Sequence, residues 1–148
     1  MKTKNLKLTC LACIASVIFI FSMSSCTVKT SFLTSTVVPA AQGTVQVKID
    51  NNKNYVIKIE ISNLSPSNRL TPPRNAYVVW LVDDNNNSKN IGQLNSSGDF
   101  MSKSLSAKFE TISSSRPVKI VITAENESDV QYPSFSEIIL TTDYLKNK

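Results

Sequence analysis

Histidine is absent from all 148 residues, and the only cysteines are Cys10, Cys13 and Cys26. Hydrolytic sites of the Ser-His-Asp and Cys-His types need a histidine as general base, so the sequence excludes both. Metal sites built from nitrogen and sulfur ligands lack their donors as well. No Ser-x-x-Lys motif occurs, which excludes a serine site of the penicillin-binding type. We therefore predict a protein that is not an enzyme, with no catalytic residues, no cofactor and no metal.

A block of basic residues is also missing. Three of the 16 Lys and Arg residues, Lys2, Lys4 and Lys7, stand at the N-terminus, and the others are interspersed with 11 acids. Nucleic-acid-binding proteins concentrate their positive charge on one patch or stripe. The sequence therefore predicts no nucleic-acid partner.

The N-terminal segment has the organisation of a secretory signal peptide. Its three lysines precede an uncharged apolar run, Leu8–Phe21, and small residues follow that run. The run is shorter than the about 20 residues that a helix needs to cross a bilayer, so it is not interpreted as a permanent span. We predict that residues 1–25 form a signal peptide that is removed.

The end of this leader, Met23-Ser24-Ser25-Cys26, resembles the bacterial lipobox, in which an apolar residue and two small ones precede a cysteine. The resemblance implies that the Cys26 thiol is lipidated and that cleavage makes Cys26 the first residue of the mature protein. The chain would then be anchored to a membrane of the bacterial cell envelope, with the periplasmic side of the outer membrane as the expected location. Because Cys10 and Cys13 leave with the leader, the mature chain would hold no disulfide.

The mature chain divides into three predicted parts. Residues 26–43 begin at the lipidated cysteine, mix small and β-branched residues with Pro39, and are interpreted as a flexible tether. A first strand near Phe32–Val38 is the alternative for this segment. Residues 44–142 are predicted to form one domain, and residues 143–148 a C-terminal tail.

Apolar residues in the domain recur with period two, which is typical of strands with one solvated face. The segment Ala76–Val82 is apolar at every position, so this strand is predicted to be covered on both faces. No segment has the period of an amphipathic helix, and residues 108–117 are predicted to be irregular. The predicted strands are Val45–Ile49, Tyr55–Ile61, Ala76–Val82, Ile91–Leu94, Phe100–Ala107, Val118–Glu125 and Phe135–Thr142.

About seven short strands separated by turn-forming segments predict an all-β fold. Asparagine-rich segments such as Asn51–Asn54 favour tight turns, because asparagine tolerates left-handed backbone conformations. The expected architecture is a single small antiparallel β-sandwich, immunoglobulin-like, with a small β-barrel as the alternative.

The strand at residues 76–82 and its surroundings resemble the extracytoplasmic C-terminal domain of RskA-like anti-sigma-K factors. That family has a Tyr-x-x-Trp-Leu strand, an acidic turn and a glycine at the head of a short strand. The matching positions here are Tyr77, Trp80, Leu81, Asp83 and Gly92, and later Ile122-Thr123-Ala124-Glu125. The similarity covers Val45–Thr142 and implies a β-sandwich in the cell envelope. It does not imply sigma-factor sequestration, because a lipoprotein leader stands where that family has a sigma-binding region and a transmembrane helix.

One acidic segment imitates the start of a calcium-binding loop. Asp83, Asn85 and Asn87 have the spacing of its first ligands. However, Ser88 and Leu94 stand where that loop needs a glycine and a bidentate glutamate. The segment is therefore predicted to be a plain hairpin turn.

A second acidic group is Glu125, Glu127 and Asp129, which could supply a carboxylate pair for glycoside hydrolysis. Because these residues straddle a predicted loop, we interpret them as solvated loop acids. A carboxylate-based envelope hydrolase is the alternative function.

Aromatic and loop residues are the remaining candidates for a binding surface. Trp80 lies between Val78 and Val82 and is predicted to be core, with Tyr77 on the opposite face of the strand. The loop residues expected to contact a ligand are Arg74, Tyr132 and Pro133, with Pro72 and Pro73 beside them. We expect a non-catalytic binding or assembly module, and its expected partner is another envelope protein or a glycan.

Overall fold

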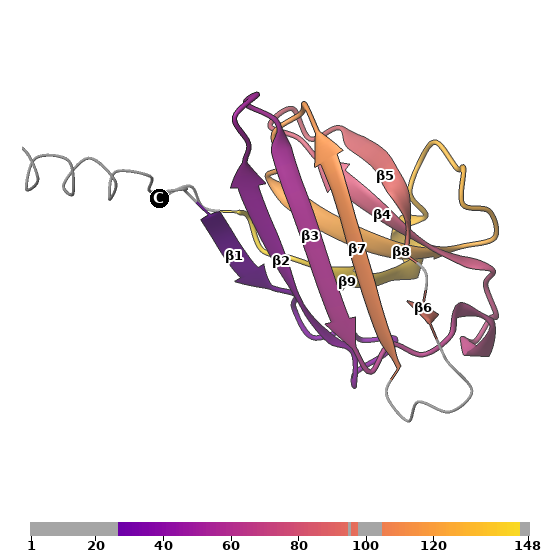
Figure 1. The fold of residues 1–148 in the computed structure, drawn as a ribbon. Helices are drawn as coiled ribbons and strands as arrows, with labels where there is room; N and C mark the ends of the chain where they lie inside the picture. The colour runs from indigo at the N-terminus through magenta and orange to yellow at the C-terminus, as the bar shows by residue number, and fades with distance from the viewer. Residues whose placement is uncertain (1–26, 95, 98–104, 146–148) are drawn as a thin grey trace, which may run out of the picture.

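A computed structural model describes residues 27–94, 96–97 and 105–145. The chain forms two sheets packed face to face (Figure 1). The helical turns in the described ranges are two short 3₁₀ segments, η1 (Ser67–Arg69) and η2 (Phe135–Glu137), and no helix there is long and apolar enough to cross a membrane. The strands are β1 (Thr27–Ser31), β2 (Gln42–Ile49), β3 (Tyr55–Ser62), β4 (Ala76–Val82), β5 (Ser88–Leu94), β6 (Ser96–Ser97), β7 (Ser106–Ser113), β8 (Lys119–Glu125) and β9 (Ile138–Thr141).

The five-stranded sheet has the order β1-β2-β3-β7-β6 and the four-stranded sheet the order β5-β4-β8-β9. All neighbouring strands run antiparallel. With β2 to β9 in the places of immunoglobulin strands A, B, C, C′, D, E, F and G, these orders read A-B-E-D and C′-C-F-G, which is the immunoglobulin arrangement. The strand β1 is an addition at the edge beside β2. The predicted all-β sandwich is confirmed, and the two sheets stay separate.

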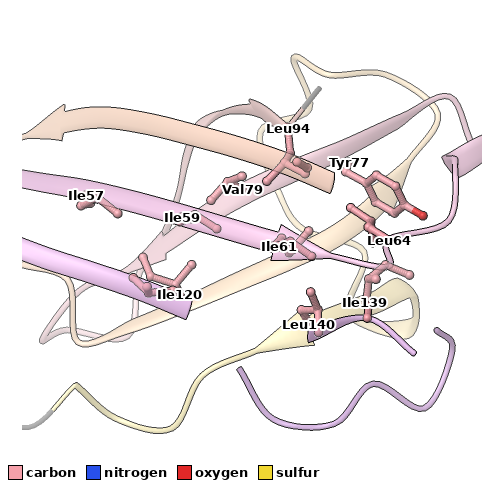
Figure 2. Packing of buried hydrophobic residues seen from close by; sticks show 14 of the residues in the cluster. Ile57, Ile59, Ile61, Leu64, Tyr77, Val79, Leu94, Ile120, Ile139 and Leu140 are labelled. Atoms are coloured by element: carbon pink, nitrogen blue, oxygen red, sulfur yellow. The ribbon is translucent and has the colours of Figure 1, made fainter. Parts of the chain in front are cut away.

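The space between the sheets holds the main hydrophobic core. On β3, the buried residues Ile57, Ile59 and Ile61 alternate with exposed Lys58 and Glu60, so the period-two pattern turns every second side chain inward. Figure 2 shows these isoleucines together with core residues from the other sheet. The buried residues of this core are Val38, Ala41, Val45, Val47, Ile57, Ile59, Ile61, Leu64, Tyr77, Val79, Leu81, Leu94, Ala107, Ile120, Ile122, Ala124, Ile139, Leu140 and Leu145.

Tyr77 enters this core from β4, on the opposite face of the strand from Trp80, as predicted. Its hydroxyl donates a hydrogen bond to the carbonyl of Ser65 at 2.7 Å. Burial raises the pKa of Tyr77 to about 12, so the hydroxyl keeps its proton at neutral pH and remains a donor. This bond ties the loop after β3 to the edge of the core.

The outer face of the five-stranded sheet is polar. Lys58 lies opposite Glu110, with 3.1 Å between Nζ and Oε1, and Lys108 lies opposite Glu60 at 3.5 Å. All four side chains are exposed. The solvated face predicted for the hairpin of residues 45–61 is therefore confirmed.

The strand β7 occupies residues that were predicted to be irregular, so the prediction for residues 108–117 is wrong in its first part. Phe109 faces the core, but Thr111 and Ser113 share its face and are polar. The apolar residues of this segment do not alternate clearly enough to indicate a strand. Cross-strand pairing with β3 specifies the strand instead. The predicted strand Phe100–Ala107 falls largely outside the described residues.

The flexible tether predicted at residues 26–43 is wrong. Thr27–Ser31 pairs along its whole length with β2, from Thr27 opposite Lys48 to Ser31 opposite Thr44. Only Val28 of this edge strand is an apolar residue packed on the core. A five-residue edge strand with one apolar side chain leaves almost no period-two signal, which is why the sequence did not predict it.

Residues 32–41 cross from one sheet to the other. The alternative prediction, a first strand near Phe32–Val38, is right in that this N-terminal segment contains a strand, but the strand is Thr27–Ser31 and ends before Phe32. Phe32 makes a single bridge to Thr142, and the Leu33 N–H donates to the Thr141 carbonyl at 2.8 Å. Val38 is buried, and its N–H donates to the Ser35 hydroxyl at 2.9 Å. This segment therefore covers the open edge of β9.

Two further boundaries differ from the prediction. The last strand begins at Ile138 instead of Phe135, because Phe135–Glu137 forms η2. The predicted C-terminal tail is docked as far as Leu145, which is buried and whose N–H donates to the Val118 carbonyl at 2.8 Å.

The two ends of the sandwich carry different segments. The start of β1 lies at the same end as the turns at residues 50–54, 83–87 and 114–118. The loops at residues 63–75 and 126–137 lie at the other end, and Figure 1 shows the second of them at the right, far from β1. An eight-residue strand such as β3 separates the ends by about 26 Å.

Candidate functional site

The outer face of the four-stranded sheet is apolar. Its buried residues are Val78, Trp80, Val82 and Val121, and Val118, Val130 and Ile138 pack against them. Trp80 is fully buried, so the prediction that it is core is confirmed. The cluster lies outside the space between the sheets, and residues of the segment between β8 and β9 cover it.

A chain of hydrogen bonds runs from Trp80 to this covering segment. The Trp80 Nε1–H donates to Thr123 Oγ1 at 2.8 Å, and the Thr123 hydroxyl donates to Glu125 Oε1 at 2.6 Å. Ser134 donates its N–H to Glu125 Oε1 at 2.9 Å and its hydroxyl to Oε2 at 2.7 Å. Burying a polar atom costs free energy unless the atom is paired, and each polar atom in this series of hydrogen bonds has a partner. These hydrogen bonds therefore fasten residue 134 to the end of β8.

Asparagine side chains hold the rest of residues 126–137, which we call the covering loop. The Asn90 amide on β5 donates to the carbonyls of Ser128 and Val130, both at 3.0 Å. The Asn75 amide donates to the Asn126 carbonyl at 3.0 Å. The loop therefore reaches from β8 across β4 to the edge strand β5 before it returns to β9.

Arg74 joins the two loops at this end of the sandwich. Its Nη2 lies 2.6 Å from Glu137 Oε1, and both side chains are largely shielded from solvent. The guanidinium also donates to the Pro73 carbonyl at 3.2 Å. Arg74 was predicted to contact a ligand, and the structure places its charge against a carboxylate of the covering loop, where it positions residues 72–75.

The covering loop presents two aromatic rings to solvent. Tyr132 is 82% exposed and Phe135 is 67% exposed, with Pro133 partly buried between them. The structure thus places the predicted residues Tyr132 and Pro133 on one loop and joins Arg74 to that loop through Glu137. Phe135 was missed, because it was assigned to the start of a strand. Its position two residues after a proline was the available signal of a loop.

The three acids of the possible carboxylate pair have different environments. Glu125 is buried, so its interpretation as a solvated acid is wrong, whereas Glu127 and Asp129 are exposed as predicted. Both carboxylate oxygens of Glu125 accept hydrogen bonds from protein groups. A general acid or base must lie within hydrogen-bond reach of the substrate, and the buried Glu125 carboxylate faces these protein donors.

In the described ranges, no group of three or more His, Cys, Asp or Glu residues is placed to hold a metal ion.

Asp83 organises the turn between β4 and β5. Its Oδ1 accepts the N–H groups of Asn85 and Asn87, both at 2.9 Å. These bonds, above all the one from the Asn87 backbone, hold the pKa of Asp83 below its usual value. Asn86 has a φ of 65°, a left-handed conformation that asparagine tolerates. The predicted hairpin turn between β4 and β5 is confirmed.

A groove of about 730 Å³ lies at the end of β3, beside the segment that follows β1. Phe32 and Ile61 line it together with Glu60 and Lys108, which form an ion pair at 3.5 Å. Among the residues that the structure describes, no buried side-chain polar atom lacks a hydrogen-bond partner. Because the covering loop presents two exposed aromatic rings, we take it as the candidate surface.

Comparison of the chain with protein-family models, with curated proteins and with solved structures finds no match. The predicted lipidation site, Cys26, lies outside the described residues and directly precedes β1.

Proposed function

We propose that the protein is a lipid-anchored lipoprotein of the bacterial cell envelope that acts as a non-catalytic binding or assembly module. Its ligand surface is the covering loop, with Tyr132, Pro133 and Phe135 as contact residues and Arg74 as the residue that positions the neighbouring loop. The observation that carries the proposal is the exposure of two aromatic rings on a loop that is fastened from beneath.

Aromatic side chains are the usual anchors of binding surfaces, because they bury a large area for the loss of few rotatable bonds. A loop that is already ordered loses little further conformational freedom when a ligand binds, so more of the contact energy appears as affinity. Glu125, Asn90 and Arg74 supply this order by fixing three separate points of the loop. The expected ligands are a second envelope protein or a glycan, since both can stack on exposed rings.

The location and family parts of the proposal rest on the sequence. The signal-peptide organisation of residues 1–25 and the lipobox-like Met23–Cys26 support a lipid anchor on Cys26, with the periplasmic side of the outer membrane as the proposed location. The likeness to RskA-like anti-sigma-K factors is proposed for the sandwich alone, without sigma-factor binding.

Lipidation is tested by growing cells with labelled palmitate. We expect label in the wild-type protein and none in Cys26→Ala, which should accumulate as an unprocessed or soluble form. A wild-type protein that takes up no label would refute the anchor.

The binding surface is tested with purified peptidoglycan and, separately, by cross-linking to envelope proteins in cells. We expect Tyr132→Ala/Phe135→Ala to lose most of the bound or cross-linked material. Tyr144→Ala is the matched control, because Tyr144 is as exposed as Phe135 and lies near Lys119, at the opposite end of the sandwich. Equal retention by the two variants, at equal folding stability, would refute the assignment of the surface.

A further inference from the structure

A row of side chains crosses the outer face of the five-stranded sheet at the end where β1 begins. Thr27 lies opposite Lys48, Lys48 opposite Val56, and Val56 opposite Ile112. Because neighbouring strands lie about 4.8 Å apart, Ile112 stands about 14 Å from Thr27 along this row. Ile112 is 63% exposed, so the row brings an uncovered aliphatic side chain to an otherwise polar face.

The next row of the same face is different. It holds Lys29, Gln46, Lys58 and Glu110, in which Lys58 and Glu110 form an ion pair. The apolar character of this face is therefore confined to the end row.

Two lysines lie at this end of the five-stranded sheet, and Lys48 is two strands away from Ile112. Lys48 is part of the end row, and Lys53 is exposed in the adjacent turn. Of the acids at this end, Asp50 accepts the N–H groups of Asn52 and Asn54 on one carboxylate oxygen, both at 2.8 Å, and holds the turn that carries Lys53. On the other sheet, Asp83 accepts backbone N–H groups of its own turn and Asp84 pairs with Arg116 at 3.7 Å. An exposed aliphatic side chain on a sheet end that also carries lysines suits the boundary between acyl chains and anionic headgroups, since lysines can keep their charge at the headgroups while their stems lie along apolar surface.

We propose that this end row rests directly on the membrane that carries the lipid anchor, with Ile112 at the surface of the bilayer and Lys48 and Lys53 beside anionic headgroups. The inference rests on the proposed lipidation of Cys26. Consecutive Cα atoms are about 3.8 Å apart, so no spacer separates Cys26 from a strand that is paired from Thr27 onward. The covering loop, at the opposite end of the sandwich, then faces away from the membrane.

The test uses the full acylated protein in vesicles of phosphatidylethanolamine and phosphatidylglycerol. The predicted mature chain has no free thiol, so Ile112→Cys and the control Asn68→Cys, exposed in η1 at the other end, can each carry one environment-sensitive fluorophore. We expect a blue shift on reconstitution and strong quenching by brominated lipid at position 112, and neither effect at position 68. A Gly-Ser linker of about 12 residues between Cys26 and Thr27, with a reach of roughly 20 Å, should keep the anchor and reduce the effects at position 112.

Three outcomes contradict the proposal, and they are distinguishable. If the protein floats with the vesicles but position 112 behaves like position 68 in water, the sandwich does not rest on its end row, although the anchor stands. If both positions are shielded, the sandwich lies on its side. If the protein does not float and mass spectrometry finds no acyl chain on Cys26, the lipid anchor is refuted, and with it the proposed contact of the end row with the membrane.

Discussion

The outer face of the five-stranded sheet meets solvent with two cross-strand ion pairs, whereas the outer face of the four-stranded sheet buries Trp80 beneath the covering loop. The difference is visible in the strands themselves. β3 alternates between buried isoleucines and exposed charges, while every residue of β4 is buried. A strand that is apolar on both faces must be covered twice, and in this protein a loop provides the second cover instead of a helix or another sheet.

The covering loop contributes few apolar side chains to the packing on this face, and hydrogen bonds hold it in place. Val130 of the loop packs on the apolar face next to Ile138 at the start of β9, and Glu125 and Asn90 fasten the loop to two different strands. The same contacts hold Tyr132 and Phe135 in place above the sheet. The comparison therefore suggests that the stability of the apolar face and the presentation of the ligand surface depend on one set of bonds.

The largest expected effect is that of Trp80→Ala. Truncation of a buried aromatic side chain typically costs about 3–5 kcal/mol, a large part of the about 5–15 kcal/mol that stabilises a domain. Urea denaturation should show this loss, and the emission of this single tryptophan in the native wild type should be blue-shifted. Lys58→Ala on the other outer face is the control, with a change below about 1 kcal/mol. Equal free energies of unfolding for the two variants would contradict the difference between the buried and the solvated outer faces.

Glu125→Ala should have the next largest effect. It removes the acceptor for Thr123 and for both donors of Ser134, and a buried donor left unpaired costs about 1–3 kcal/mol. Glu60→Ala is the matched control on the solvated face and should cost less than about 1 kcal/mol. If thermal and urea denaturation find no difference between them, Glu125 does not hold the loop.

Asn90→Ala should destabilise the protein by about 1 kcal/mol, because it removes two hydrogen bonds to the covering loop and the acceptor of the Gly92 N–H on its own strand. Limited proteolysis is the more sensitive readout, and cleavage should accelerate within residues 126–131. Asn68→Ala, in the exposed turn η1, is the control. Unchanged cleavage of the covering loop would show that Asn90 does not anchor it.

The smallest expected effect is the coupling between Lys58 and Glu110. A double-mutant cycle with alanine at both positions should give about 0.2–1 kcal/mol, because exposed ion pairs gain little in water. The coupling should weaken further as salt is added. A salt-insensitive coupling of several kcal/mol would mean that this face is covered as well.

The sequence predicted the parts of the fold whose side chains alternate or are uniformly apolar. β3, β4 and β8 were found because isoleucines and valines recur on their faces, and the turn at Asp83 was found from its asparagines. It missed β1 because one apolar side chain gives no period, and it misassigned β7 because Thr111 and Ser113 point inward. Such strands are specified by their partners, which local sequence does not reveal.

The candidate site was predictable only in outline. Tyr132, Pro133 and Arg74 were selected as loop residues, and they do lie on two loops at one end of the sandwich. The burial of Glu125 and the pairing of Arg74 with Glu137 were not predictable, because both depend on how the covering loop folds back over Trp80. The apolar outer face of β4 indicated that a cover exists but not which segment provides it.

The most direct test of the central claim, that the covering loop is a fixed part of the apolar face, is amide hydrogen exchange at Ser134. Its N–H donates to the buried Glu125 carboxylate at 2.9 Å, so we predict strong protection in the wild type and loss of that protection in Glu125→Ala. Exchange of the Ser134 amide at the rate of an unstructured peptide in the wild-type protein would contradict the account.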